Sequence, residues 1–437
     1  MIKRSILVCC MVFAVLFSAK GQDVNTDSST LNLSFEDAVN MALERNRTLQ
    51  NASLDVKKAE AAKWEAIATM LPQVSGSLGY SSNLGYEMVM DAGAMGKFTM
   101  NMPSTGTVGL QASVAVSAAQ IISTQIGKIS IDMANVAKSQ SEQEITNQVR
   151  ILYYSALVSE QTQELLTKNL ESLKKLYDYS QKAVDVGAAE QVDADQIMVQ
   201  VATMETTLNT SKRSMEMVYN SMRLFLNIDV DTEISLTQGI DDLLSIPNAM
   251  ALISEDLVLE NNYNYQLVNQ STKLSKKQVD LAGWAYAPTL SAFYKFTKTH
   301  YFGDGGMRST PPNMIGATLS IPIFSSAQRY KALQGAKFEY QKQQNLLADT
   351  EMSLKIQHRQ LKYNLTSALE RLETQKKNVE VSQRVFDNIS LKYEHGYSSS
   401  MDVTTSGTNL IAAQSSYVQA LLEFVNAQIE LEKLLNK

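Results

Sequence analysis

The chain has only two cysteines in 437 residues, and both lie close to the N-terminus, at Cys9 and Cys10. Beyond that point the sequence offers no disulfide framework and no thiol chemistry. Histidine is nearly as rare: none of the three, His300, His358 and His395, has a second ligand at metal-binding spacing. There is also no nucleophile elbow, no phosphate-binding glycine loop and no H-E-x-x-H motif. These absences argue against an enzyme and predict no cofactor and no metal.

Proline is scarce as well, and its distribution is informative. None of the seven prolines falls in residues 104–246 or 323–437, and residues 128–186 and 336–395 lack both proline and glycine. Because proline breaks helix interiors, both blocks are free to form very long helices. As one helix, the 59 residues of 128–186 would span about 90 Å. Such a rod predicts a coiled coil or a tube.

Long hydrophobic runs are also missing. The most apolar run covers residues 6–17, which is too short for a membrane-spanning helix. It follows the basic pair Lys3-Arg4 and precedes small residues, so residues 1–21 are predicted to be a secretory signal peptide. The alternative, a lipoprotein acylated at Cys9 or Cys10, would leave almost no apolar segment before the cysteine. Removing Lys3, Arg4 and Lys20 takes the net charge from −6 to about −9, which argues against nucleic-acid binding.

What the sequence does contain is an internal duplication. Leu43-Glu44-Arg45-Asn46 recurs as Leu259-Glu260-Asn261-Asn262, a shift of 216 residues. The same shift carries Gln50 to Gln266 and Pro72 to Pro288. An internal repeat of this kind governs the fold. We therefore predict that residues 22–437 form one interleaved protomer, with repeat 1 at about 31–230 and repeat 2 at about 250–437.

Each repeat contains two segments in which apolar and small polar residues alternate. They lie at about 73–84 and 105–116, and again at about 289–300 and 313–322, with Phe293 as an exception on the polar side. Such alternation over about ten residues is typical of outer-membrane strands, with apolar side chains toward lipid and polar ones toward a lumen. A half-buried sheet on a soluble domain is the alternative. Four such strands in duplicated pairs behind a signal peptide favour the membrane.

The segments between the paired strands, 85–104 and 301–312, are rich in glycine and polar residues and are predicted to be outward-facing loops. The first loop also carries a cluster of methionines, Met88, Met90, Met95, Met100 and Met102. Thioether sulfur binds Cu(I), but methionine is also an ordinary flexible packing residue, and we favour packing.

The proline-free blocks are predicted to be two helical hairpins, at about 120–226 and 325–435. Each long arm ends at a single glycine, Gly187 or Gly396, which supplies the left-handed conformation that closes a turn. Apolar residues then recur at alternating steps of three and four, as in a heptad seam. We interpret these residues as core packing, not as a cofactor site. Examples are Ile197, Val201, Met204 and Leu208 in the first hairpin, and Val403, Leu410, Ala413 and Tyr417 in the second.

Four strands do not close a barrel, and an open strand edge is not tolerated in lipid. The chain must therefore oligomerise if these strands span a membrane. Three copies give 12 strands, which predicts a homotrimer with one shared barrel.

This arrangement resembles the TolC family of outer-membrane efflux and secretion ducts over nearly the whole chain after residue 21. The matching features are the helix-to-strand segments ending at Pro72 and Pro288, the exit sequence Ser320-Ile321-Pro322-Ile323-Phe324, and the two tips. The fold class that the resemblance implies is mainly α with membrane β. A trimer would form a 12-stranded outer-membrane β-barrel continued by a periplasmic α-helical barrel.

The resemblance also implies partners and a location. The duct would lie in the bacterial outer membrane, in contact with its lipid, and extend into the periplasm. It would passively conduct substrates from an inner-membrane pump of the RND or ABC type through a periplasmic membrane-fusion adaptor protein. The alternatives are a secreted or periplasmic coiled-coil scaffold or adhesin with a soluble β cap, and a periplasmic adaptor, which should lack duplicated strands.

Three residues match family positions at the periplasmic pore. The resemblance implies that Asp402 belongs to a ring of carboxylates, and that Tyr393 and Asp193 belong to the contacts that hold the pore shut. Two positions depart from the family pattern: Ser398 replaces an arginine found in some members, and Thr405 replaces a second aspartate ring. The tip residues that the resemblance places at the adaptor-docking surface are Gly187, Ala188, Ala189, Gly396, Tyr397 and Ser398.

Overall fold

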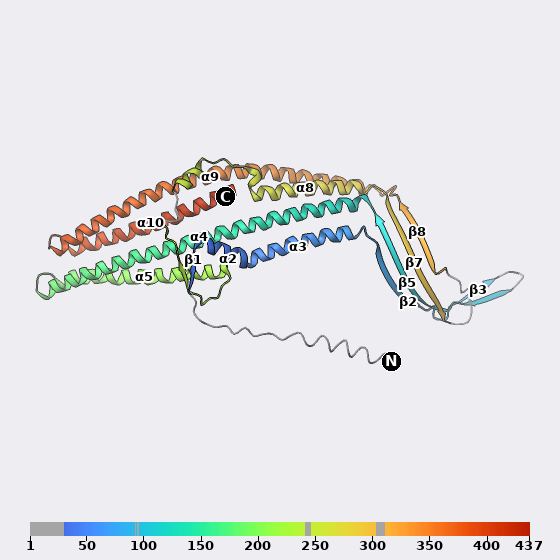
Figure 1. Ribbon diagram of the computed structural model, residues 1–437, viewed down its shortest axis with the longest axis horizontal. Coiled ribbons are helices and arrows are strands. Elements are labelled where there is room, and N and C mark those ends of the chain that lie inside the picture. Colours follow the sequence, from blue (N-terminus) through green and yellow to red (C-terminus); the bar gives the residue numbers. More distant parts are fainter. Residues whose placement is uncertain (1–29, 92, 94–95, 241–245, 303–310) are drawn as a thin grey trace, which may run out of the picture.

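The computed structural model describes residues 30–91, 93, 96–240, 246–302 and 311–437. The predicted signal peptide and Met95 of the methionine cluster lie outside the described residues. The protein is a long bundle of helices with a four-stranded sheet at one end and two helical turns at the other (Figure 1). The C-terminus lies about midway along the bundle (Figure 1).

The two repeats follow the same order of helix, strands and long helical hairpin, so the predicted fold class is confirmed. In the first repeat the elements are β1 (Leu31–Leu33), α2 (Phe35–Arg45), α3 (Arg47–Ala68), β2 (Gln73–Ser81), β3 (Glu87–Asp91), β4 (Lys97–Asn101), β5 (Ser104–Val116), α4 (Ala118–Asp185) and α5 (Gln191–Leu226). In the second they are β6 (Ile234–Leu236), α7 (Ile246–Ser254), a short 3-10 turn η2 (Leu259–Asn261), α8 (Tyr263–Trp284), β7 (Thr289–Phe302), β8 (Asn313–Ser320), α9 (Gln328–Glu394) and α10 (Ser400–Leu435).

Corresponding helices of the two repeats have nearly the same length. Helices α3 and α8 each have 22 residues, α5 and α10 each have 36, and α4 and α9 have 68 and 67. In each repeat the long arm packs against the short helix near the sheet and against its hairpin partner near the tip. The arm α4 also packs against α8, which joins the two repeats side by side.

In the part of the chain that the structure describes, no helix is both long and apolar enough to cross a membrane.

The core of the bundle is built from the predicted seams. One buried cluster lies around the middle of the bundle and includes Tyr153 and Phe424, and a second extends toward the tips. The second includes Ile197 and Met204 from α5 and Leu410 from α10, all fully buried. These side chains are packing residues, as their spacing indicates.

The large sheet is antiparallel throughout, in the order β2-β5-β7-β8. Its register aligns Gly76, Leu110 and Phe296 in one cross-strand row and Ser75, Gln111 and Lys295 in the next. Because adjacent residues of a strand point to opposite faces, the register separates an apolar face from a polar face across all four strands. The apolar face carries Val74, Leu78, Tyr80, Val108, Leu110, Val114, Leu290, Tyr294, Phe296, Ile315 and Leu319.

Phe293, which breaks the alternation, has a local partner. It lies on the polar face, paired with Gly316 of β8. A Cβ atom built on Gly316 would lie 2.7 Å from the Phe293 ring, so the ring occupies the space over the glycine. The aromatic side chain thus covers a bare stretch of backbone.

The observed strand ends differ from the approximate predicted bounds by up to three residues, and the first predicted loop contains two further strands. The predicted loop 85–104 contains the hairpin β3–β4, and β7 continues to Phe302 because that residue pairs with Ser104. Strand β2 ends at Ser81, before Leu84, whose φ is +48°, and β8 ends before Pro322, which has no N–H to donate. Part of the second predicted loop, residues 303–310, lies outside the described residues.

The helix starts differ from the prediction for local reasons. Helix α4 begins at Ala118, two residues early, because Ser117 and Gln120 form a capping box. Helix α9 begins at Gln328, three residues late, because Ser326 and Ala327 both have positive φ angles.

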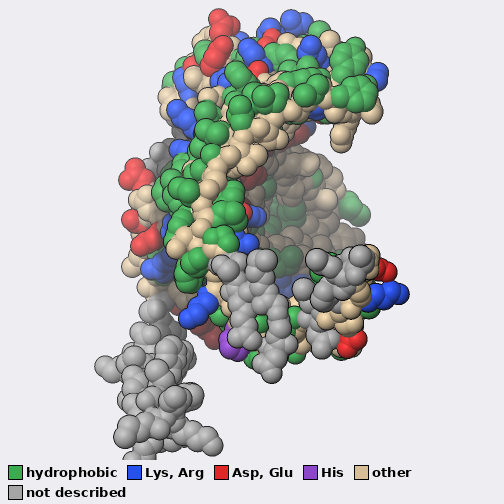
Figure 2. Space-filling view, turned by 90° about the vertical axis from the view of Figure 1, so that its right-hand side faces the viewer, with side chains coloured by type: hydrophobic (Ala, Val, Ile, Leu, Met, Phe, Trp, Pro, Cys, Tyr) green, Lys and Arg blue, Asp and Glu red, His purple; other side chains and the backbone are tan. Residues whose placement is uncertain are grey.

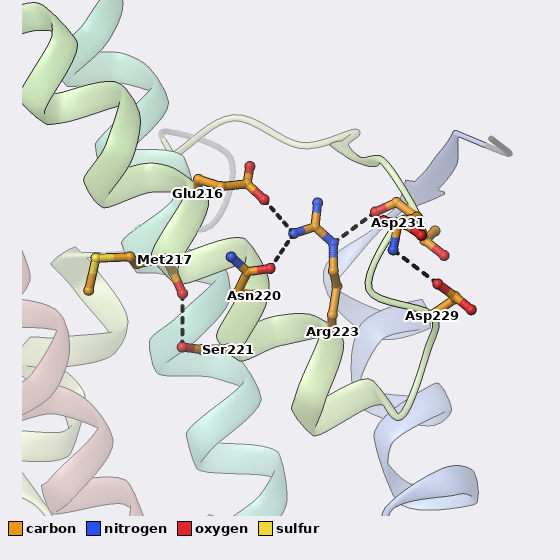
Figure 3. A network of polar contacts seen from close by, with 8 residues as sticks. Glu216, Met217, Asn220, Ser221, Arg223, Asp229 and Asp231 are labelled. Atoms are coloured by element: carbon orange, nitrogen blue, oxygen red, sulfur yellow. Dashed lines mark hydrogen bonds and ion pairs between the residues drawn. The ribbon is translucent and has the colours of Figure 1, made fainter.

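The short strands β1 and β6 form a belt around the middle of the bundle, which was not predicted from the sequence. Strand β1 pairs in parallel with β6, and the Tyr153 hydroxyl donates a hydrogen bond to the Leu33 carbonyl at 3.0 Å. At the end of α5, the Arg223 guanidinium donates to Glu216, Asn220 and the Thr232 carbonyl (Figure 3). This network fixes the turn between α5 and β6, which carries the chain from one repeat to the other.

Two asparagines at equivalent positions make the same link, each within its own repeat. Asn46 caps α3 by accepting from Thr48 N, and its amide donates to the Phe225 carbonyl at 3.2 Å. Asn262 caps α8 by accepting from Tyr265 N, and its amide donates to the Leu434 carbonyl at 3.0 Å. Each asparagine thus joins the start of a short helix to the end of a hairpin helix.

We predict that Asn262→Asp lowers the midpoint of thermal unfolding, measured by far-ultraviolet circular dichroism. Aspartate still caps the helix, but it loses the N–H donor and places a carboxylate oxygen against the buried Leu434 carbonyl. We expect a cost of about 1–3 kcal/mol. Asn378→Asp is the control, because Asn378 is exposed and its side chain, among the described residues, bonds only to Gln375 three residues away. Equal loss of stability in both variants would contradict the role of Asn262.

Candidate functional site at the helical tips

Both hairpins turn through the same backbone motif. At the first tip, Gly187 N donates to the Val184 carbonyl at 2.9 Å and Ala188 N to the Ala183 carbonyl at 2.8 Å. This pair of bonds is a Schellman motif, which ends a helix at a residue in the left-handed region. Gly187 has φ of +74°, as the sequence predicts for a turn glycine.

The second tip repeats this geometry. Gly396 N donates to the Tyr393 carbonyl at 2.9 Å, and Tyr397 N donates to the Lys392 carbonyl at 2.8 Å. Gly396 has φ of +76°, and a Cβ atom there would meet no neighbour within 4 Å. Glycine is therefore favoured at both tips by backbone conformation and not by lack of space.

Apolar side chains are exposed around both tips. Val186 and Tyr397 expose 80% and 84% of their surface. Val192 and Met401, each five residues beyond its tip glycine, expose 59% and 57%. Exposed apolar side chains gathered at one end of a molecule mark a contact surface.

Behind the tips, Tyr393 joins the two hairpins. It is buried, and its hydroxyl donates a hydrogen bond to Ser180 Oγ on α4 at 2.8 Å. Its ring meets that of Tyr179 edge to face at 6.2 Å, and the Tyr179 hydroxyl donates to the Glu394 carbonyl. Burial raises the pKa of Tyr393, and the nearby Asp193 carboxylate raises it further against the opposing effect of the Ser180 hydrogen bond. The hydroxyl therefore remains a donor.

Asp193 makes a second link between the hairpins. Ser400 Oγ lies 2.5 Å from Asp193 Oδ1 and 3.0 Å from Gln196 Oε1. A hydroxyl has one proton, so Ser400 donates to one of these oxygens at a time, and the shorter contact to the carboxylate is the stronger. Ser400 is buried, so this link is shielded from solvent.

Asp402 is exposed and has a different environment. Its Oδ2 accepts hydrogen bonds from Ser398 Oγ, Ser399 N and Ser399 Oγ, at 3.0, 3.0 and 2.8 Å. Together with the bond from Asp402 N to Ser399 Oγ, these contacts form a capping box at the start of α10. The donors from Ser399 and Ser398 lower the pKa of Asp402, so the carboxylate stays ionised. No hydrogen bond from a described residue reaches Oδ1.

The structure therefore brings Asp193 and Tyr393 into one cluster between the hairpins and leaves Asp402 outside it. The predicted tip residues Ala188, Ala189 and Ser398 flank the turns. Ser180, Ser400 and Tyr179 were not predicted from the sequence, because their partners are more than 200 residues away in the chain. The spacing from Ser399 to Asp402 did contain a capping-box signal.

A further polar link lies deeper in the same seam. Asn169 of α4 donates to Gln414 Oε1 of α10 at 2.7 Å, and both side chains are buried. A buried polar pair in an apolar seam fixes the alignment of the two helices, as a buried asparagine does in coiled coils.

Comparisons with known proteins indicate the family. The sequence model of the family described as outer membrane efflux protein matches residues 38–227 and 252–437. The probable efflux pump outer membrane protein TtgC of Pseudomonas putida is 20% identical over 418 residues, covering 91% of this chain and 81% of the relative. The antibiotic efflux pump outer membrane protein ArpC of Pseudomonas putida matches to the same extent.

Solved structures have the same fold at low sequence identity. The structure of CusC aligns with a TM-score of 0.75 at 15% identity and covers 95% of each chain. The CmeC outer membrane channel of Campylobacter jejuni aligns with a TM-score of 0.74 at 16% identity, covering 92% of this chain and 85% of CmeC.

We predict that removing both hydroxyl links behind the tips loosens the hairpins. Spin labels at Val186→Cys and Tyr397→Cys report the tip-to-tip distance by pulsed electron resonance in samples diluted with unlabelled chain. Both native cysteines, Cys9 and Cys10, lie in the predicted signal peptide and need no replacement. The pair Tyr393→Phe and Ser400→Ala should broaden the distance distribution, because each lost buried hydrogen bond costs about 1 kcal/mol.

The control for this measurement is Ser416→Ala, because the Ser416 hydroxyl donates within its own helix, to the Ala412 carbonyl. An unchanged distribution in the Tyr393→Phe and Ser400→Ala variant would show that the links do not hold the tips together.

Proposed function

The chain belongs to the outer membrane efflux protein family, and from this premise we propose that three copies form the exit duct of a tripartite efflux or type I secretion system. The duct lies in the bacterial outer membrane, extends into the periplasm, and works with a periplasmic adaptor and an inner-membrane pump. The relatives that it matches are named as efflux proteins. We propose that this chain, too, conducts its substrates passively and catalyses no reaction.

The observation that carries the proposal is the apolar face of the sheet. Leu78 and Ile315 expose 85% and 83% of their surface, and Val74 exposes 73%. Figure 2 views the molecule from the sheet end and shows a band of hydrophobic side chains beside a band of polar side chains and backbone. One such face against lipid and the other against an aqueous lumen is the pattern of membrane strands. A soluble cap on a scaffold or adhesin would gain nothing from so large an exposed apolar face.

The open edges of the sheet support association with further copies of the chain. Strands β2 and β8 each pair on one side only within the described residues. In hydrocarbon an unpaired backbone edge is strongly unfavourable, so β8 of one copy must pair with β2 of the next. Three copies close the barrel with 12 strands.

Aromatic residues mark the end of the sheet where the helices begin. Trp284 and Tyr286 are about half exposed, and the Arg329 guanidinium lies 5.3 Å from the centre of the Tyr286 ring. Tryptophan and tyrosine gather where a membrane meets water, because their rings are apolar and their polar atoms remain hydrated. We place the periplasmic surface of the outer membrane at this level.

We propose that the exposed tips dock the adaptor. Gly187 and Gly396 hold the turns that present Val186, Val192, Tyr397 and Met401 to a partner, with Ala188, Ala189 and Ser398 beside them. An adaptor with apolar side chains at its own end would cover these residues.

We also propose that Asp402 and Asp193 shape the periplasmic mouth. Threefold symmetry makes one Asp402 into three carboxylates around an axis, each held ionised and with one oxygen open to solvent. Such a ring attracts cations and repels anions. Asp193 and Tyr393, in the links between the hairpins, would set how readily the mouth opens.

We predict that efflux depends on the tip turn. A strain lacking the gene should regain resistance to a pump substrate with the wild-type chain but not with Gly396→Val, because a β-branched residue at positive φ costs about 1 kcal/mol or more and misplaces the tip. Trimer level and membrane insertion should remain normal.

Gly335→Val is the matched control, because Gly335 lies within α9, has no positive φ and would place its Cβ in open space. Full efflux by the Gly396→Val variant would exclude the docking role, and recovery of the wild-type chain in the soluble fraction would exclude the duct itself.

We predict that Asp402→Asn makes the reconstituted channel less selective for cations and less sensitive to block by divalent cations from the periplasmic side. Asparagine retains an oxygen that accepts from Ser399 N, so the helix cap survives while the charge is lost. The reversal potential in a salt gradient measures selectivity. Asp349→Asn, which removes an exposed charge far from the tips on α9, is the control. Unchanged selectivity would leave Asp402 with its capping role alone.

A further inference from the structure

The outward end of the apolar sheet face contains a hollow. Two neighbouring cross-strand rows form it: Leu78, Val108 and Lys298 in one, and Tyr80, Gly106 and His300 in the other. These residues line a hollow of about 520 Å³. Gly106 has no side chain between Tyr80 and His300, and the Phe302 ring lies over part of the space that this leaves.

Aromatic contacts hold the wall of the hollow. The Phe302 ring lies edge to face with His300 at 4.7 Å and with Tyr80 at 5.9 Å. A Cβ atom on Gly106 would lie 3.1 Å from the Phe302 ring, so even alanine would crowd this wall. The imidazole is thus held by packing on the strand that also carries Lys298.

Lys298 gives the hollow a positive charge. Strands β2, β5, β7 and β8 contain two lysines, Lys295 and Lys298, and no aspartate or glutamate. Lys298 is exposed, and no ion pair joins it to any described residue. Lys298 and His300 are two positions apart on the same face, about 7 Å along the strand, so both can reach one anion.

From this combination of charge and apolar walls, we propose that the hollow binds the phosphate headgroup of a glycolipid of the outer leaflet. Lys298 and His300 would donate to the phosphate oxygens, and an acyl chain would lie along Leu78 and Val108. Basic residues beside an apolar membrane-facing surface are the usual means of recognising an anionic lipid headgroup. The proposal rests on the proposed function, because it requires this face to lie in the outer membrane with the β3–β4 end outward.

The probe is lipid A carrying both phosphates, added to the delipidated wild-type trimer and detected by native mass spectrometry. Lipid A without phosphates and inorganic phosphate are the comparison ligands. The variant combines Lys298→Gln and His300→Gln. The matched control is Lys295→Gln, which removes the same charge from the opposite face of the same strand.

We expect the wild type and the Lys295→Gln control to retain phosphorylated lipid A, and the Lys298→Gln and His300→Gln variant to retain about tenfold less, the effect of losing charge-assisted hydrogen bonds. Equal retention by the variant, equal retention of the dephosphorylated lipid, or displacement by millimolar inorganic phosphate would each overturn the proposal.

Measurements of channel conductance distinguish a failure of the lipid site from a failure of the proposed function. A wild-type trimer that conducts ions but retains no phosphorylated lipid refutes the lipid site alone. A chain that forms no conducting trimer refutes the proposed function, and the lipid site with it.

Discussion

Backbone N–H and C=O groups cannot remain unpaired in hydrocarbon, and the form of this molecule depends on that constraint. One chain supplies four strands with two open edges, so it is incomplete in a membrane until other copies add theirs. The helices continue from the strands after only short connections, and Ser117, the residue that follows β5, caps α4. The symmetry that closes the strands is therefore imposed on the helices as well.

The duplication places pairs of residues at equivalent positions in the two repeats. Some pairs make the same contacts, and others make different ones. Asn46 and Asn262 make the same pair of contacts in their two repeats. Asp193 and Asp402 each lie six residues beyond a tip glycine, yet only Asp402 caps its own helix, because Ser399 precedes it where Glu190 precedes Asp193. Asp193, free of that role, bonds to the other hairpin. The difference between Ser399 and Glu190, three residues before each aspartate, thus gives the two aspartates different roles.

Local patterns in the sequence were enough to predict the strands, the long hairpins and the glycine turns, because alternation, proline scarcity and positive φ act within a few residues. The belt formed by β1 and β6 escaped prediction because strands of three residues have no readable period. The β3–β4 hairpin was missed because its two five-residue strands lie among turn residues. Tyr393 and Asp193 came from resemblance alone, since Ser180 and Ser400 are distant in sequence and only folding brings them near.

The matched lengths of the two hairpins have a geometric consequence. Because α5 and α10 have equal lengths and α4 and α9 differ by one residue, the two tips of a protomer end at nearly the same height. Three protomers would then present six tips at nearly the same height, three of each kind. A partner in six copies would meet two kinds of binding site, one with Val186 exposed at the tip and one with Tyr397. The difference in affinity between these two kinds of place would decide whether three copies of the partner bind first or all six together.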